Sequence, residues 1–360
     1  MRGAFVDQGL LFSYISPEAR VPPNHPLRRI RALVRDVLGE LNRSFGKLYS
    51  SEGRPSIPPE QLLSALLLQV FYGIRSERQL MEQLDYNLLY RWFVGLSPDD
   101  PVWDPTSFTK NRERLQNGDV FTKFMNKLLN HPQIKPLLSD EHFSVDGTLI
   151  EAWASQKSFR PKDGSDDGDG ANFHGQKRKN DTHASTSDPD SRLYRKAAGR
   201  EARLSYMGHA TMENRHGLAV AGMVTLANGT AERRASEKML KTKAKEAGHR
   251  ITAGEDKAYD TADHVANLRA INVTPHVTQN NGVTKAGKSR RSAIDERTTR
   301  HQGYGMSQSR RAMVECIFGW GKQHGTMRKT KHRGICRVAA DFMLNLIAYN
   351  LIRVPKLVPA

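Results

Sequence analysis

The stretch HFSVDGTLIEAW, residues 142–153, decides the fold, because here the pattern of the chain changes from helical to strand-like. Its β-branched and aromatic residues predict a strand. Asp146 lies inside this otherwise apolar run and is followed by Gly147. A buried carboxylate without a partner costs several kcal/mol, so Asp146 needs either a metal ion or the role of a strand-end cap for a turn.

The chain after this strand alternates between strand and helix patterns. Residues 204–230 predict two alternating strands that turn at Asn214–Gly217. A charged helix, a short strand in RITAGEDKAYD, a helix, a strand in NVTPHVTQN and two closing helices follow, the helices over 232–248, 260–270, 306–325 and 338–353. This order predicts an α/β (α+β) fold with a mixed sheet covered by helices.

Residues 1–130 read as a separate, all-helical region. Pro58 and Pro59 precede the apolar run at 62–74, which predicts a helix opened by proline, and Ser76 with Gln79 forms a capping box for the next helix. Asp85 can cap a third helix, which Gly95 ends. Short helices joined by tight turns are typical of helix-turn-helix DNA readers, but any small helical bundle has the same pattern. We expect a helical domain over 1–130 and a second domain over 131–360.

One segment interrupts the second domain. Residues 155–200 are rich in Gly, Asp, Ser and Lys and offer almost nothing to bury. The segment follows the first carboxylate-bearing strand, so we interpret it as a flexible insertion in the second domain.

The composition indicates a polyanionic partner. The formal net charge is +17 with an isoelectric point near 9.9, and residues 281–360 hold sixteen Lys or Arg against four Asp or Glu. Two cysteines cannot form a disulfide framework, and the apolar run at 62–74 is too short to span a bilayer. We therefore expect a cytoplasmic protein that binds nucleic acid rather than membrane.

Three acidic residues suit a metal-dependent phosphoryl-transfer site. Arg311, Glu315 and Lys322 are four and seven residues apart, which on one helix stacks a carboxylate between two cations. Asp146 and Asp256 each lie near a predicted strand end. Hard divalent cations prefer oxygen ligands, and two of them can clamp the attacking and leaving oxygens of an in-line displacement.

The second acidic position has two rivals in the sequence. Glu255 and Asp260 compete with Asp256, and strand alternation separates only Glu255 from it. We choose Asp256 because Lys257 and Tyr259 flank it. The cations expected to contact the DNA backbone are Arg311, Lys322, Arg328, Lys329, Lys331 and Arg333.

These motifs resemble a known family. The blocks SVDGT, GEDKAYD and R-x3-E-x6-K are similar to the three acidic motifs of bacterial insertion-sequence DDE transposases of the IS-four/IS-five superfamily, and IPPEQLLSALLLQVFYGIRSERQL is similar to their helical N-terminal block. The resemblance implies Asp146, Asp256 and Glu315 as the catalytic, metal-binding triad. The family's tyrosine three positions before Arg311 is replaced by Gln308, and the nearest tyrosine is Tyr304.

The resemblance also implies an RNase H-like catalytic domain, two Mg²⁺ ions, which Mn²⁺ can replace, and double-stranded DNA as partner, both as terminal inverted repeats and as target. The expected function is cutting of element ends and joining of their 3′-hydroxyl groups to target DNA. Joining two ends needs two active sites, hence a homodimer or a larger assembly. The alternatives are a non-catalytic DNA-binding descendant and a nuclease that hydrolyses without joining.

Overall fold

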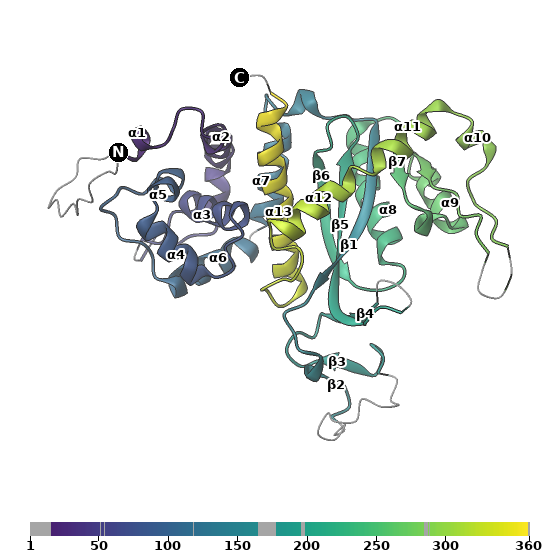
Figure 1. The fold of residues 1–360 in the computed structure, drawn as a ribbon, viewed down its shortest axis with the longest axis horizontal. Helices are drawn as coiled ribbons and strands as arrows, with labels where there is room; N and C mark the ends of the chain where they lie inside the picture. Colours follow the sequence, from purple (N-terminus) through teal and green to yellow (C-terminus); the bar gives the residue numbers. More distant parts are fainter. Residues whose placement is uncertain are drawn as a thin grey trace, which may run out of the picture.

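The structure is a computed structural model, and it describes residues 16–50, 52–53, 55–117, 119–164, 178–195, 199–283, 287 and 289–358. Only helices occur among the described residues before the first strand (Figure 1). They are α1 (Pro17–Arg20), α2 (Pro26–Gly46), α3 (Pro59–Phe71), α4 (Glu77–Tyr86), α5 (Leu88–Val94), α6 (Pro105–Asn117) and α7 (Val120–Asn130).

Local sequence explains where these helices begin and end. Proline opens α3, and the Ser76 side chain accepts a hydrogen bond from the Gln79 amide at 3.0 Å, as the capping box predicts. The prediction that Asp85 caps α5 is wrong, because Asn87 occupies that place and accepts from the amides of Leu89 and Tyr90. Gly95 ends α5 in the left-handed conformation, at φ 88°.

The main sheet is mixed. Its central strand β1 (His142–Glu151) pairs in parallel with β7 (Ile251–Glu255), which pairs in parallel with β8 (Val273–Val277). On the other side β1 pairs antiparallel with β5 (Arg203–Glu213), which pairs antiparallel with β6 (Ala219–Leu226). The order β6-β5-β1-β7-β8 with only β5 reversed is that of an RNase H-like sheet, which confirms the predicted fold class.

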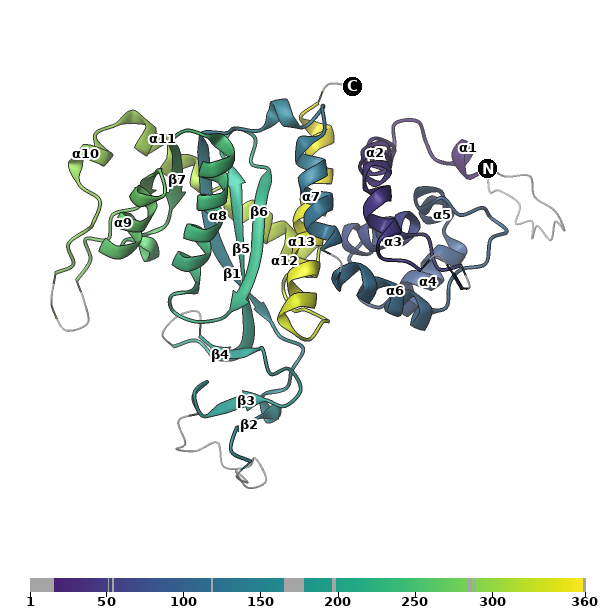
Figure 2. The same cartoon turned by 180° about the vertical axis from the view of Figure 1, so that it is seen from behind.

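Helices cover both faces of this sheet. Figure 2 shows α8 (Ala231–Ala247) in front of the sheet, with α9 (Ala262–Ala270) packed beside it against β8. Figure 1 shows α11 (Gln302–Arg311), α12 (Val314–Gln323) and α13 (Ile335–Arg353) across the opposite face. The short α10 (Glu296–Thr299) precedes α11, and single 3₁₀ turns occur at η1 (Lys135–Leu137), η2 (Gln156–Ser158), η3 (Lys257–Tyr259) and η4 (Val354–Lys356).

Helix α13 lies between the sheet and the N-terminal helices. It contacts β6 on one side and α3, α6 and α7 on the other, so it is apolar around most of its circumference. Asn350 within it is buried but satisfied, because its amide donates to the Ala219 carbonyl at 2.7 Å and accepts from the Ala219 amide at 2.9 Å. Among the described residues, Ile335–Lys356 alone is long and apolar enough for a membrane span, and 67% of its apolar window is buried inside the protein.

The predicted continuous helix over 306–325 is wrong. Helix α11 ends at Arg311 and α12 begins at Val314, with Ala312 and Met313 in a turn between them. Both helices contact β1, but α11 also packs against β7 and β8, whereas α12 also packs against β5 and α13. Arg311 and Glu315 therefore belong to different helices rather than to one face of a single helix.

The segment 155–200 holds more structure at its flanks than its composition suggests. Within it β2 (Phe159–Pro161) pairs with β3 (His183–Ser185), and β4 (Arg192–Tyr194) extends the main sheet along β5. Asp188 is fully buried and accepts hydrogen bonds from the Tyr206 hydroxyl at 2.6 Å and the Gly334 amide at 3.1 Å. Residues 165–177 and 196–198 lie outside the described residues, so flexibility of the insertion stays a prediction.

Candidate active site

The two aspartates come from neighbouring parallel strands. Asp146 lies in the middle of β1, so the prediction that it ends a strand is wrong, whereas Asp256 directly follows the last residue of β7. The register of β1 and β7 ends with Ser144 opposite Gly254, and each aspartate follows two residues later. Asp146 is half-buried, and one of its oxygens accepts from the Gly147 amide at 2.8 Å. Asp256 caps η3 by accepting from the Ala258 amide at 2.7 Å. In α/β sheets ligands bind beyond the carboxyl ends of the strands, which is where Asp256 lies.

Glu315 and Arg311 approach Asp146 from the helices across the sheet. The pKa of Asp146 is raised to about 6, chiefly by burial; the Gly147 hydrogen bond lowers it, the charge of Asp256 raises it, the charge of Arg311 lowers it, and the charge of Glu315 raises it. The structure thus brings all three predicted acidic residues and Arg311 into one electrostatic group, although α11 and α12 are separate helices. Glu315 is exposed in the first turn of α12.

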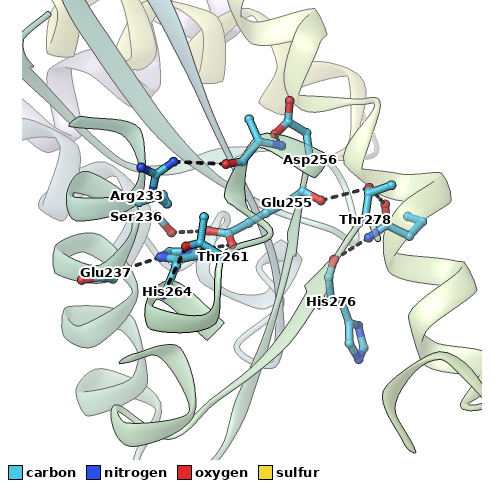
Figure 3. Close-up of polar contacts among 11 residues, drawn as sticks. Arg233, Ser236, Glu237, Glu255, Asp256, Thr261, His264, His276 and Thr278 are labelled. Carbon is cyan, nitrogen blue, oxygen red and sulfur yellow. Dashed lines mark hydrogen bonds and ion pairs between the residues drawn. The ribbon is translucent and has the colours of Figure 1, made fainter. Parts of the chain in front are cut away.

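Glu255 and Asp256 point in different directions. Figure 3 shows the Glu255 carboxylate directed at Ser236 and His264, while Asp256 lies away from them. Glu255 is fully buried, accepts from the Ser236 hydroxyl and contacts His264 Nε2 at 2.8 Å. The other ring nitrogen of His264 lies 2.8 Å from Glu237. Glu255 is therefore part of the packing between β7, α8 and α9.

Asp260, the other rival, has a structural role in the loop after β8. Its two oxygens accept from the Asn280 amide at 2.7 Å and from the Ala293 amide at 2.9 Å. Both acceptors are engaged with backbone, so Asp260 stabilises the connection between β8 and α10.

Asp146, Asp256 and Glu315 offer the kind of ligand atoms that a divalent cation needs. Carboxylate oxygens are the donors that Mg²⁺ and Mn²⁺ prefer, and a cation would relieve the repulsion that Asp256 and Glu315 exert on Asp146. Among the described residues, only Asp140, Glu141 and His249 bring three ligand atoms within 4.8 Å of one another, and they lie before β1 and β7. Asp146, Asp256 and Glu315 are not among the described residues that meet this criterion.

The predicted DNA-contacting cations fall into two groups. Arg328, Lys329 and Arg333 are exposed, and Lys322 is half-buried in the last turn of α12. Lys329 lies 3.2 Å from Glu151 and 5.3 Å from the ring centre of the exposed Trp153.

Lys331 differs from these cations, because its ammonium group is buried without a hydrogen-bond partner among the described residues. Burial lowers its pKa to about 8. This placement is opposite to the surface position that a phosphate contact needs, so the structure does not support Lys331 as a contact residue.

The position that the family pattern gives to tyrosine has a structural use here. Gln308 donates from its amide to the His276 carbonyl, which fixes α11 to β8. Tyr304, one turn earlier, donates from its hydroxyl to the Val277 carbonyl at 3.0 Å. Both side chains anchor α11 on the backbone of β8.

Sequence reasoning missed two residues beside the site. His264, which holds Glu255, was one of thirteen scattered histidines, and no spacing pattern singled it out. Tyr259 was noted only as a neighbour of Asp256. It is 1% exposed, and its hydroxyl has no hydrogen-bond partner among the described residues.

Comparison with known proteins identifies the family. Residues 15–114 match a transposase domain (DUF772), and residues 272–355 match a transposase DDE domain that includes Arg311, Glu315 and Lys322. No curated protein matches the chain significantly.

Solved transposase structures are similar only at a distance. The piggyBac transposase synaptic complex with hairpin DNA is 12% identical, with 91% of this chain and 74% of that chain covered and a TM-score of 0.39. The Mos1 transposase paired-end complex with left transposon end is 9% identical, with 62% and 61% covered and a TM-score of 0.20. Structural similarity this weak adds nothing to the family assignment. On the two matching transposase domains, one at each end of the chain, the chain belongs to the DDE transposases.

Proposed function

We propose that this protein is the transposase of an insertion sequence, which cuts the element ends and joins their 3′-hydroxyl groups to target DNA. The observation that supports the proposal is the grouping of Asp146 in β1 with Asp256, which follows β7, and Glu315 in α12, since the charges of the last two act on the first. Three carboxylates with one arginine are a donor set for divalent cations and phosphate rather than for an apolar substrate.

The residues would divide the work between holding metal and holding DNA. Asp146, Asp256 and Glu315 would hold two Mg²⁺ ions, or Mn²⁺ in their place. When bound, such ions activate an attacking oxygen and stabilise the leaving oxygen of an in-line displacement. Arg311, which lies close enough to act on Asp146, would orient the scissile phosphate.

The same carboxylates would serve cutting and joining. Water is the attacking group for the nick, and the freed 3′-hydroxyl is the attacking group for joining, so no protein nucleophile is needed. Asp146 must be ionised to hold a cation, and with a pKa of about 6 it is largely ionised at neutral pH. Two ends need two such sites, which implies a homodimer or larger assembly on DNA.

The domains would have separate roles. The helical region 1–130 would recognise the terminal inverted repeats and support assembly, and residues 131–360 would form the catalytic domain. Exposed cations at Arg328, Lys329 and Arg333 would follow the DNA backbone, with Lys322 nearer the site. A soluble, cytoplasmic location fits this role.

The test is cleavage and joining of the element's own ends. A labelled duplex that carries the inverted repeat bordering the gene is incubated with the protein and Mg²⁺. We expect a nick at the repeat end and, with a pre-cut 3′ end, a strand-transfer product. Binding without a nick would favour a non-catalytic DNA-binding protein, and a nick without transfer of the pre-cut end would favour a hydrolytic nuclease.

A further inference from the structure

A fourth carboxylate lies beside the first aspartate. Glu232, in the first turn of α8, packs its side chain against the backbone of Gly147, the residue after Asp146. A Cβ atom on Gly147 would lie 2.9 Å from Glu232 Oε1 and 3.0 Å from its Cγ. Only glycine at position 147 leaves room for this carboxylate where it stands.

Beside Asp146 and Gly147, β1 is paired with β5 but not with β7. Beyond Ser144 and Gly254, β1 and β7 no longer pair, because β7 ends at Glu255 and the chain turns into η3. Consecutive residues of a strand face opposite sides of a sheet, so Asp146 and the Gly147–Glu232 contact lie on different faces. The two carboxylates are linked by a group on which both charges act, the Tyr259 side chain.

The Tyr259 hydroxyl is buried and lies within range of both charges. The Tyr259 hydroxyl, at the end of η3, has no hydrogen-bond partner among the described residues, and the side chain is 1% exposed. Its pKa is raised well above 10, first by burial and then by the charges of Glu232, Glu255, Asp146 and Asp256. An unpaired, buried donor among carboxylates is a group that a bound ligand would satisfy.

We propose that Glu232 is a fourth carboxylate of the metal site, which holds the divalent cation together with Asp146, and that the Tyr259 hydroxyl donates a hydrogen bond inside this group when the cation is bound. The inference rests on the proposed metal-dependent function and deepens it. Neither transposase domain match includes Glu232, Tyr259 or Asp146.

A purely structural role for Glu232 makes a different prediction. A glutamate in the first turn of a helix stabilises that helix through the helix dipole, with or without a cation. In that case loss of the charge would lower the melting temperature equally in the presence and absence of metal. As a ligand, Glu232 would instead change the affinity for the cation itself.

The experiment titrates the full chain with Mn²⁺ alone. Electron paramagnetic resonance measures the concentration of free Mn²⁺, and this gives the affinity of the protein for the ion. We expect Glu232→Gln to weaken binding at least about tenfold, and Glu232→Asp to recover part of the loss because it keeps the charge. The control is Glu246→Gln in the same helix, an exposed glutamate 2.8 Å from Lys243, which should bind as the wild type does.

Asp146→Asn separates the possible failures. If Asp146→Asn weakens Mn²⁺ binding and Glu232→Gln does not, the fourth ligand is refuted and the proposed function stands. If the wild-type protein binds no Mn²⁺, the metal-dependent function itself fails.

Two further variants guard against misfolding of the first. Gly147→Ala displaces the Glu232 carboxylate without changing any charge and should reproduce the loss of Mn²⁺ affinity. Tyr259→Phe removes an unpaired hydroxyl, so the metal-free melting temperature should not fall, while Mn²⁺ binding should weaken severalfold. If both variants have the circular dichroism spectrum of the wild type and bind Mn²⁺ as tightly as it does, the proposal is overturned.

Discussion

The carboxylates of Glu255 and Asp256 lie in different environments although the residues are consecutive. Glu255 is fully buried, with Ser236 and His264 as partners, whereas Asp256 is half-buried at the start of η3 beside Asp146. Strand alternation produces this separation, because consecutive side chains at the end of β7 point to opposite faces of the sheet. Glu255 points toward α8 and α9, and Asp256 points toward the candidate site. One carboxylate therefore supports the fold and the other is available for a ligand.

This separation predicts opposite effects of two conservative substitutions. Asp256→Asn should abolish nicking and joining with little change in melting temperature, because it removes a negative ligand and keeps the shape. Glu255→Gln should lower the free energy of unfolding by about 2 kcal/mol or more, because it leaves His264 with an incomplete buried ion pair. Cleavage assays paired with thermal melts measure both, and a stable but inactive Glu255→Gln would reverse our assignment of the two residues.

Asp146 should destabilise the metal-free protein at neutral pH. Its folded-state pKa of about 6 exceeds the ordinary value of 3.8, so the folded state loses stability as pH rises through that interval. Asp146→Asn should then gain on the order of 2 kcal/mol at pH 7 and little at pH 3. Thermal melts of both proteins in a chelator across this pH range test the difference. An equal effect at both pH values would mean that the charge of the Asp146 carboxylate does not destabilise the fold.

The His264 contacts should give the stability of the protein a pH dependence. Burial lowers the pKa of His264, but the hydrogen bonds and charges of Glu255 and Glu237 outweigh it and raise the pKa above 6.5. A raised histidine pKa stabilises the fold fully below pH 6.5, and this contribution is lost as pH rises through the folded-state value. His264→Gln should flatten that part of the pH–stability curve. A curve that keeps the wild-type slope would assign the dependence to another group.

Lys329 and Lys331 should behave differently although the sequence treats them alike. Lys329 is exposed, so Lys329→Ala should reduce the log–log salt slope of DNA binding by about 0.9, the value for one lost phosphate contact. Lys331→Met should leave that slope unchanged. Titrations of a labelled duplex at several salt concentrations compare the two variants. A slope change for Lys331→Met would place its ammonium group on DNA after all.

The same substitution at Lys331 should stabilise the fold. Burial lowers its pKa from 10.5 to about 8, so below pH 8 the folded state carries a buried positive charge that destabilises it. Stability of the wild type should rise between pH 8 and 10.5, where the unfolded chain binds more protons. Lys331→Met should gain on the order of 2 kcal/mol at pH 7 and nothing above pH 10.5. A loss of stability at pH 7 would show that the charge has a partner.

The order of strands and helices could be predicted from sequence because it depends on local pattern. Alternation in residues 204–226 predicted β5 and β6 with the turn between them, and the charged run at 232–248 predicted α8. The break between α11 and α12 could not be predicted, because no glycine or proline marks Ala312 and Met313. It accompanies a change of packing partner, from β7 and β8 for α11 to β5 and α13 for α12, while both helices contact β1.

The candidate site was partly accessible from sequence. Acidic residues at predicted strand ends and in the R-x3-E-x6-K pattern single out Asp146, Asp256 and Glu315 from sequence alone, although β1 in fact continues past Asp146. Glu232 carries no such mark, since it is one charge among many in α8, and only the close approach to Gly147 distinguishes it. Lys331 shows the converse, because a run of cations along the chain does not reveal which side chain turns inward.

The central claim is that Asp146, Asp256 and Glu315 form one metal-dependent site for cutting and joining DNA. Its most direct test is strand transfer of a pre-cut, labelled element end into plasmid DNA with Mg²⁺, by the wild type and by Asp146→Asn, Asp256→Asn and Glu315→Gln, with binding of the same end measured in parallel. We predict transfer by the wild type, none by any of the three variants, and end binding by all four proteins. Transfer at the wild-type rate by any folded triad variant would contradict the account.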